Sequence, residues 1–128
     1  MRLWIRWVVI DVDSIDILID ALSVLGCDVT MQGSYAEDEQ LPADFFTYWI
    51  NDSDDGNHYD NQASSTNDYI SLNFYSTSPN NTYSYIKQVK KLLKEKGFIV
   101  SGNGYNIASG VTTHYGRAID VIYVEREV

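Results

Sequence analysis

The feature that most constrains the fold is the strict alternation of side chains over residues 68–77. Ile70, Leu72 and Phe74 point one way while polar residues and tyrosines point the other, which is the two-residue period of a strand with one buried face. Ser78-Pro79 follows at once, and serine is a favoured N-cap while proline fits the first helical position. The sequence therefore predicts a half-buried strand that leads directly into a helix.

Two amphipathic helices are predicted. Residues 14–25 carry a helical stripe of Ile15, Leu18, Ile19, Leu22 and Leu25. Asp13 or Ser14 can cap its start, and Gly26 suits the left-handed residue that ends a helix. Residues 79–96 carry a second stripe, and Gly97 ends that helix. The inner stripe consists of Tyr85, Ile86, Val89, Leu92, Leu93 and the Lys96 stem.

Further strands are predicted at 27–31, 45–50, 98–100 and 113–125. An acidic loop is expected at 33–42, a turn at 51–56 and a glycine-marked loop at 102–110. Residues 3–10 suit either a strand or a first helical turn. Consecutive strands without helices between them favour an α+β fold, with a mostly antiparallel (mixed) sheet and two helices on one face. We expect a single domain over residues 1–128.

Composition and charge exclude several classes of protein. The chain has 128 residues and one cysteine, so no internal disulfide is possible and a disulfide-stapled secreted domain is excluded. We expect a soluble protein that is made in a reducing compartment. Net charge is −9, the wrong sign for a broad nucleic-acid surface, and no apolar run reaches a membrane span. Residues 1–66 carry 13 acids and 2 bases, whereas residues 67–128 carry 5 acids and 7 bases. Ordinary solvated faces or a functional polarity both fit this division.

No pattern of reactive residues supports catalysis. His58 and His114 come with no nucleophile elbow, and Cys27 follows a predicted helix end, where the helix dipole disfavours a thiolate. Cys27, His58 and His114 are too far apart in the sequence to match the ligand spacing of a zinc site. The acidic run at 51–56 lacks the end residues of a calcium loop. We predict no catalytic, metal or cofactor-binding residue, although a small acid-dependent enzyme using Asp52, Asp54 or Asp55 stays an alternative.

Exposed tyrosines and paired charges are the candidate interface. Tyrosine offers a large rigid surface with a polar tip, and is enriched at protein interfaces. Tyr83, Tyr105 and Tyr115 are expected in or near loops, and Tyr69 and Tyr75 on the outward face of the strand at 68–77. Alternatively, a second layer of the structure covers that outward face. The candidate interface residues are Asp52, Asp54, Asp55, Tyr69, Tyr75, Lys87, Lys90, Lys91, Lys94, Tyr105, Tyr115 and Arg117.

Five segments together resemble a known family. They read FFTYW at 45–49, GNHYDN at 56–61, NFYSTSP at 73–79, GFIVSGNGY at 97–105 and THYGR at 113–117. Their order and spacing resemble the tail-terminator, or tail-to-head joining, proteins of long-tailed phages and prophages of Gram-positive bacteria. The resemblance covers roughly residues 44–126, and the first 43 residues match only in general pattern. The start of the chain departs from the family pattern, because residues 1–10 are unusually apolar for a solvated terminus.

The resemblance implies a structural role in the virion. Members are small α+β proteins that form a ring, typically a hexamer, on the head-proximal end of the tail tube. The implied partners are other copies of the chain, the tail-tube protein and a head-completion or connector protein, with no cofactor and no membrane. The implied location is the virion tail after synthesis in the bacterial cytoplasm. Another neck or head-closure component, a small enzyme and a monomeric binding module are the alternatives.

Overall fold

The computed structural model describes residues 14–35, 40–55, 58–59, 62–63 and 65–126. Two α-helices and a short 3-10 helix accompany strands that range from two to twelve residues. The elements are α1 (Ser14–Leu22), η1 (Ser23–Leu25), β1 (Asp28–Met31), β2 (Asp44–Asp55), β3 (His58–Tyr59), β4 (Gln62–Ala63), β5 (Ser65–Ser76), α2 (Pro79–Glu95), β6 (Ile99–Val100), β7 (Tyr105–Ile107) and β8 (Tyr115–Arg126).

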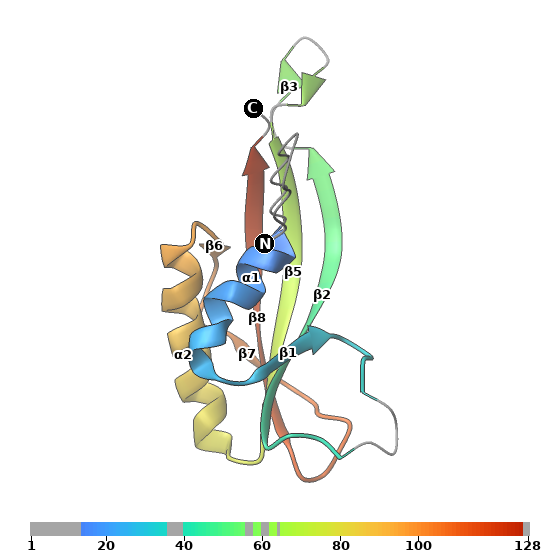
Figure 1. Cartoon of the computed structure of the whole chain (residues 1–128), viewed down its shortest axis with the longest axis vertical. Coiled ribbons are helices and arrows are strands. Elements are labelled where there is room, and N and C mark those ends of the chain that lie inside the picture. Colours follow the sequence, from blue (N-terminus) through green and yellow to red (C-terminus); the bar gives the residue numbers. More distant parts are fainter. Residues whose placement is uncertain (1–13, 36–39, 56–57, 60–61, 64, 127–128) are drawn as a thin grey trace, which may run out of the picture.

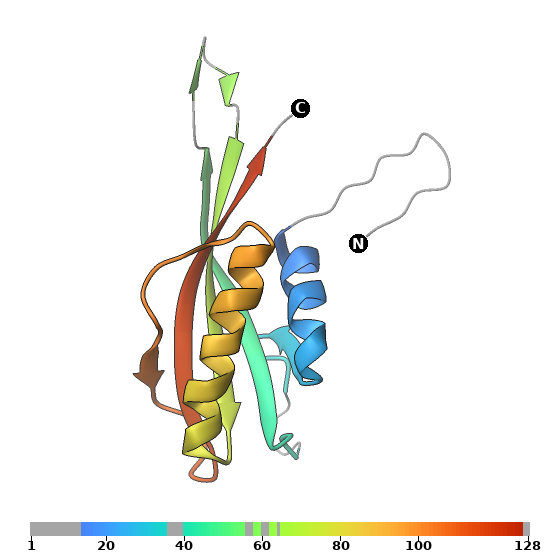
Figure 2. The ribbon, with the colours of Figure 1, turned by 90° about the vertical axis from the view of Figure 1, so that its left-hand side faces the viewer.

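A mixed sheet with two helices on one face forms the body, as predicted (Figures 1 and 2). The strand order is β1-β2-β5-β8-β6, and β7 also pairs with β8. Among the described strands of this sheet, β1 and β2 run parallel and the other pairs are antiparallel. The pair β3–β4 forms a small separate ladder. The α+β prediction is therefore confirmed.

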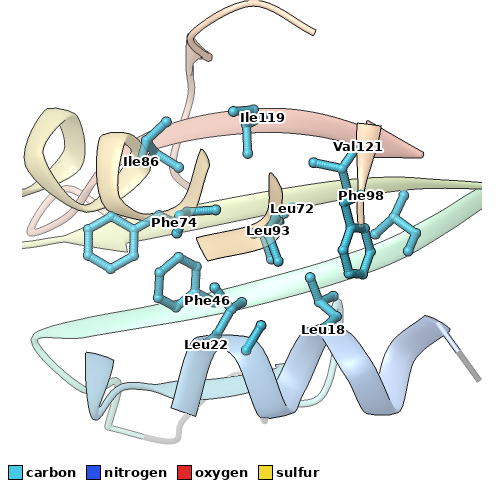
Figure 3. Close-up of a cluster of buried hydrophobic side chains, with 13 residues drawn as sticks. Leu18, Leu22, Phe46, Leu72, Phe74, Ile86, Leu93, Phe98, Ile119 and Val121 are labelled. Atoms are coloured by element: carbon cyan, nitrogen blue, oxygen red, sulfur yellow. The ribbon is translucent and has the colours of Figure 1, made fainter. Parts of the chain in front are cut away.

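The core lies between the helices and the sheet (Figure 3). Ile70, Leu72 and Phe74 of β5 are almost fully buried, which confirms the predicted inward face of that strand. The rings of Phe46 and Phe74 lie 4.6 Å apart. Burying each such side chain contributes about 1.5–3 kcal/mol. The helices supply the opposite layer, with Leu18, Ala21, Leu22, Ile86, Val89 and Leu93.

The helix ends have the predicted backbone conformation but lack a predicted side-chain capping bond. Gly26 and Gly97 have φ of 73° and 93°, the left-handed conformation expected where a helix ends. Ser78 occupies the N-cap position of α2, but its side chain makes no capping hydrogen bond. Instead, the Ser78 amide donates to Ser76 Oγ at 3.0 Å, and Thr82 Oγ1 donates to the Pro79 carbonyl at 2.6 Å.

The turn predicted at 51–56 is wrong for its described residues. Strand β2 continues through Asp55, with Asp52 opposite Tyr69 and Asp55 opposite Thr66 on β5. The register shifts between Ile50 and Asp52, so the Asx-rich stretch forms a bulged strand. The glycine-marked loop likewise contains β7, a strand that the sequence did not predict and that begins at Tyr105. Tyr83 lies within α2, inside the helix predicted for 79–96. The expectation for residues 3–10 lies outside the described residues.

Candidate interaction surfaces

Unlike charges lie toward opposite edges of the sheet. We call Asp16, Asp20, Asp28 and Asp52 the acidic edge: these residues belong to α1, β1 and β2. Asp20, Asp28 and Asp52 are exposed. We call Lys87, Lys90, Lys91 and Lys94 the lysine stripe, because their spacing places them along one side of α2, which packs over β5 and β8 (Figure 2).

The lysine stripe belongs to the β8 side of the molecule. Lys90 donates to Asn103 Oδ1 at 2.8 Å, in the loop that precedes β7. Lys87, Lys91 and Lys94 are exposed, as the helical pattern predicted. Lys96 is also exposed, although its aliphatic stem was expected at the edge of the inner stripe. The stripe therefore presents positive charge to solvent at the side opposite the acidic edge.

Polar side chains form a row across the face of the sheet that the helices leave uncovered. Asn51 Nδ2 donates to Ser71 Oγ at 2.6 Å, and Ser71 Oγ donates to Asp120 Oδ1 at 3.2 Å. Tyr105 OH donates to the same carboxylate at 3.0 Å. Partial burial, the hydrogen bond to Asp120 and the charge of Asp120 all raise the pKa of Tyr105. Asp120 is therefore held by neighbours on two strands rather than presented as a free acid.

Aromatic side chains gather at the other end of this face. Phe45 stacks on Tyr75 with ring centroids 5.2 Å apart, and it meets the His114 ring edge-on at 5.6 Å. Tyr35 packs edge-on against Phe45 at 5.1 Å. Together with the loops around residues 32–35 and 109–114 they line a hollow of about 320 Å³. Burial raises the pKa of Tyr75. Tyr75 is thus partly covered by a second layer of loops, the alternative that the sequence left open.

His114 fixes this second layer, and sequence reasoning did not single it out as a structural residue. The ring is 8% exposed. Its Nε2–H donates to the Pro42 carbonyl at 2.8 Å, and Nδ1 accepts from Thr113 Oγ1 at 2.9 Å. The two loops joined in this way are far apart along the chain. Only the THYGR segment at 113–117 pointed to this position.

Arg117 has a packing role in this chain. Its guanidinium lies over the Tyr83 ring, 4.4 Å from the centroid. It donates to Asn106 Oδ1 at 2.9 Å and to the carbonyls of Asn103 and Gly104 at 3.2 Å. Arg117 thus ties β8 to α2 and to the loop before β7. Tyr115, by contrast, is 53% exposed and lines a hollow of about 330 Å³ with Tyr83.

The remaining candidate residues are scattered. Tyr69 is half-buried on β5, close to the acidic end of β2, and Asp54 and Asp55 belong to that strand. Cys27 packs against the core, where burial and the charges of Asp44 and Asp28 raise the pKa of its thiol. Among the described residues, no group of three His, Cys, Asp or Glu side chains is placed to hold a metal ion.

An apolar hollow marks a surface that the sequence did not predict. It measures about 350 Å³ and is lined by Ile15, Met31, Tyr48, Trp49 and Ile50. Met31, Trp49 and Ile50 are 51%, 49% and 42% exposed. The hollow lies where β1 ends beside the longer β2, a difference in strand length that no local pattern reveals.

Comparisons with known proteins identify no relative. No protein-family model matches the sequence, and no curated protein is significantly similar to it. In the part of the chain that the structure describes, no helix is long and apolar enough to cross a bilayer.

Proposed function

We propose that this chain is a structural subunit that assembles side by side with its own copies, as a tail-terminator-like ring on the head-proximal end of a phage tail tube. The observation that carries the proposal is the opposition of charge across the sheet, with the acidic edge on one side and the lysine stripe on the other. A ring needs heterologous contacts, in which one patch meets a different patch on the next subunit. Unlike charges at opposite sides supply such a pair.

Two further observations support an assembly role. The resemblance of residues 44–126 to tail-terminator proteins suggests the ring, its tail-tube and head-connector partners, and its place in the virion. In addition, Asp120 on the uncovered face and Arg117, which lies over Tyr83 of α2, are already bonded within the chain. We therefore propose the exposed lysines of α2 and the exposed acids Asp20, Asp28 and Asp52 as the charges that meet a partner.

The test combines tube capping with charge reversal. The protein is added to polymerising tail-tube subunits of a Gram-positive phage, and tube length is measured by electron microscopy. We expect shorter, capped tubes with the wild-type chain and loss of capping with the triple variant Lys87→Glu, Lys91→Glu and Lys94→Glu. The matched triple Lys→Arg variant keeps the charge and is expected to cap normally. Helical circular dichroism confirms that each variant is folded.

A compensating variant separates assembly from general charge effects. Adding Asp20→Lys, Asp28→Lys and Asp52→Lys to the Lys→Glu variant restores opposite signs at the two sides, and capping is expected to return. Tubes of unchanged length with the wild-type protein in excess would contradict the proposal. Binding to head connectors without capping would instead indicate a head-closure role. A monomer in dilute solution is compatible with the proposal, because ring subunits can assemble only on the tube.

A further inference from the structure

A small hollow of about 140 Å³ lies on the face of the sheet that the helices leave uncovered. It is lined by Asn51, Tyr69, Ile70, Ile99, Ser101, Asp120, Val121 and Ile122. Ile122 pairs with Tyr69 on one side and with Ile99 on the other, so these three side chains share one face. Pockets for small molecules usually measure roughly 300–1,000 Å³, so this hollow suits a single side chain rather than a cofactor.

One side of the hollow is apolar. Ile99 is 53% exposed, and Tyr69 and Ile122 are partly buried beside it. A wall of this kind can cover the methylene stem of a long side chain. Lysine and arginine bury their stems along apolar surface in this way while the charged head stays at a polar group.

The other side of the hollow carries two oriented acceptors. The Asn51 amide and the Asp120 carboxylate are joined through Ser71 Oγ, which accepts from the amide and donates to the carboxylate. An amide that donates through Nδ2 keeps its carbonyl oxygen as an acceptor. Tyr105 OH contacts both oxygens of Asp120, at 3.0 and 3.2 Å. A carboxylate has about four lone-pair sites, so these bonds fix the direction of Asp120 without using its whole capacity to accept.

The charge of the hollow selects the kind of ligand. Asp120 is exposed, and the described residues that line the hollow include no lysine or arginine. Arg117 precedes it on the same strand but lies on the helix side, over the ring of Tyr83. The hollow therefore presents a fixed negative charge beside an apolar wall, and its complement is a cation on an apolar stem.

We infer that this hollow receives an arginine side chain of another protein, with its stem along Ile99 and Ile122 and its guanidinium at Asp120. The planar guanidinium has five donors, so it can bind a carboxylate and a neighbouring amide oxygen together, whereas an ammonium is a compact point charge. Arginine is also enriched at protein interfaces, and lysine is depleted there. The inference is separate from the proposed ring, whose charge pairing does not involve Asp120.

A titration followed by NMR tests the inference on the full-length, ¹⁵N-labelled protein. The probes are the peptide acetyl-Gly-Gly-Arg-Gly-Gly-amide and two matched peptides with citrulline or lysine in place of arginine. Citrulline keeps the shape of the side chain but has no charge. We expect saturable shifts of the amides of Tyr69, Ile99 and Asp120 with up to about 10 mM arginine peptide. The citrulline peptide should bind at least about tenfold more weakly, and the lysine peptide should lie between them.

Two pairs of variants locate the binding. Asp120→Asn removes the charge of the hollow and should weaken binding about tenfold, whereas Asp20→Asn removes the same charge from an exposed position of α1 and should leave binding unchanged. Ser101→Trp fills the hollow but keeps Asp120, and it should abolish the shifts. Its control, Ser84→Trp, is exposed on α2 and should not. Circular dichroism confirms that each variant is folded.

Several outcomes would overturn the inference. Equal binding of the arginine and citrulline peptides would show that charge is not recognised, as expected of a site for a neutral ligand. The absence of saturable shifts at about 10 mM arginine peptide would show that the hollow binds no arginine. Binding that is weakened by Asp20→Asn as much as by Asp120→Asn would place the peptide elsewhere, and stronger binding of the lysine peptide would reject arginine as the occupant.

Discussion

Replacing His114 with alanine tests how firmly the second layer of loops is held. The variant loses the hydrogen bond to the Pro42 carbonyl, 2.8 Å long, and the edge-on contact with Phe45. A net hydrogen bond contributes about 1 kcal/mol and an aromatic pair about 0.5–1.5 kcal/mol. The ring is also almost fully buried, so its apolar surface adds to the loss. We expect a decrease of about 2–3 kcal/mol in the free energy of unfolding.

Urea unfolding followed by circular dichroism measures this change. A loss of that size lowers the midpoint by roughly 1–2 M urea. Thr113→Ala is the matched control, because Thr113 is exposed and the change removes the hydroxyl that donates to Nδ1 of the ring. We expect it to lower the free energy of unfolding by less than about 1 kcal/mol. A His114→Ala variant within about 0.5 kcal/mol of wild type would refute the reasoning.

Two further predictions concern a glycine and a tyrosine. Gly104→Ala and Gly97→Ala both place a side chain at a φ near +92°, which costs about 1–2 kcal/mol. At Gly104 the added Cβ also lies 2.8 Å from the Ala118 carbonyl, whereas nothing lies within 4 Å at Gly97. Thermal unfolding should therefore show a larger loss for Gly104→Ala, and equal losses would contradict the packing argument. The raised pKa of Tyr105 means that its contribution to stability is complete below its unfolded pKa, near 10, and disappears as the pH rises through the folded value. Tyr105→Phe should weaken the fall in stability above pH 10, and an unchanged alkaline profile would argue against it.

Local patterns predicted the elements whose ends are set by backbone preference. Gly26 and Gly97 end their helices as expected, and Ser78-Pro79 begins α2. The alternation of Ile70, Leu72 and Phe74 correctly gave the buried face of β5. These features depend on side-chain periodicity and on the φ angles that glycine and proline favour, so neighbouring residues suffice to reveal them.

Features set by distant partners were not predictable in this way. Asn51–Asp55 reads as a turn by composition, but the ladder with β5 keeps it extended, and a bulge absorbs the irregularity. Likewise, β7 is only three residues long and exists because β8 pairs with it. The lysine stripe was correctly placed on the solvent side of α2, whereas Arg117 and Tyr75 gave a misleading signal of exposure. Their partners, Tyr83 and Phe45, come from other parts of the chain.

The pairing of β5 with β8 has a consequence for how the chain folds. Ser76 pairs with Tyr115 and Ser65 with Arg126, so this central ladder closes a long loop that contains α2 and β7. During synthesis β2 and β5 can form their hairpin early, but one side of β5 then waits for the last strand of the sheet. Nonlocal closure of this kind slows folding and prolongs exposure of an open strand edge. Truncation within β8 is therefore expected to yield aggregation rather than a smaller folded protein.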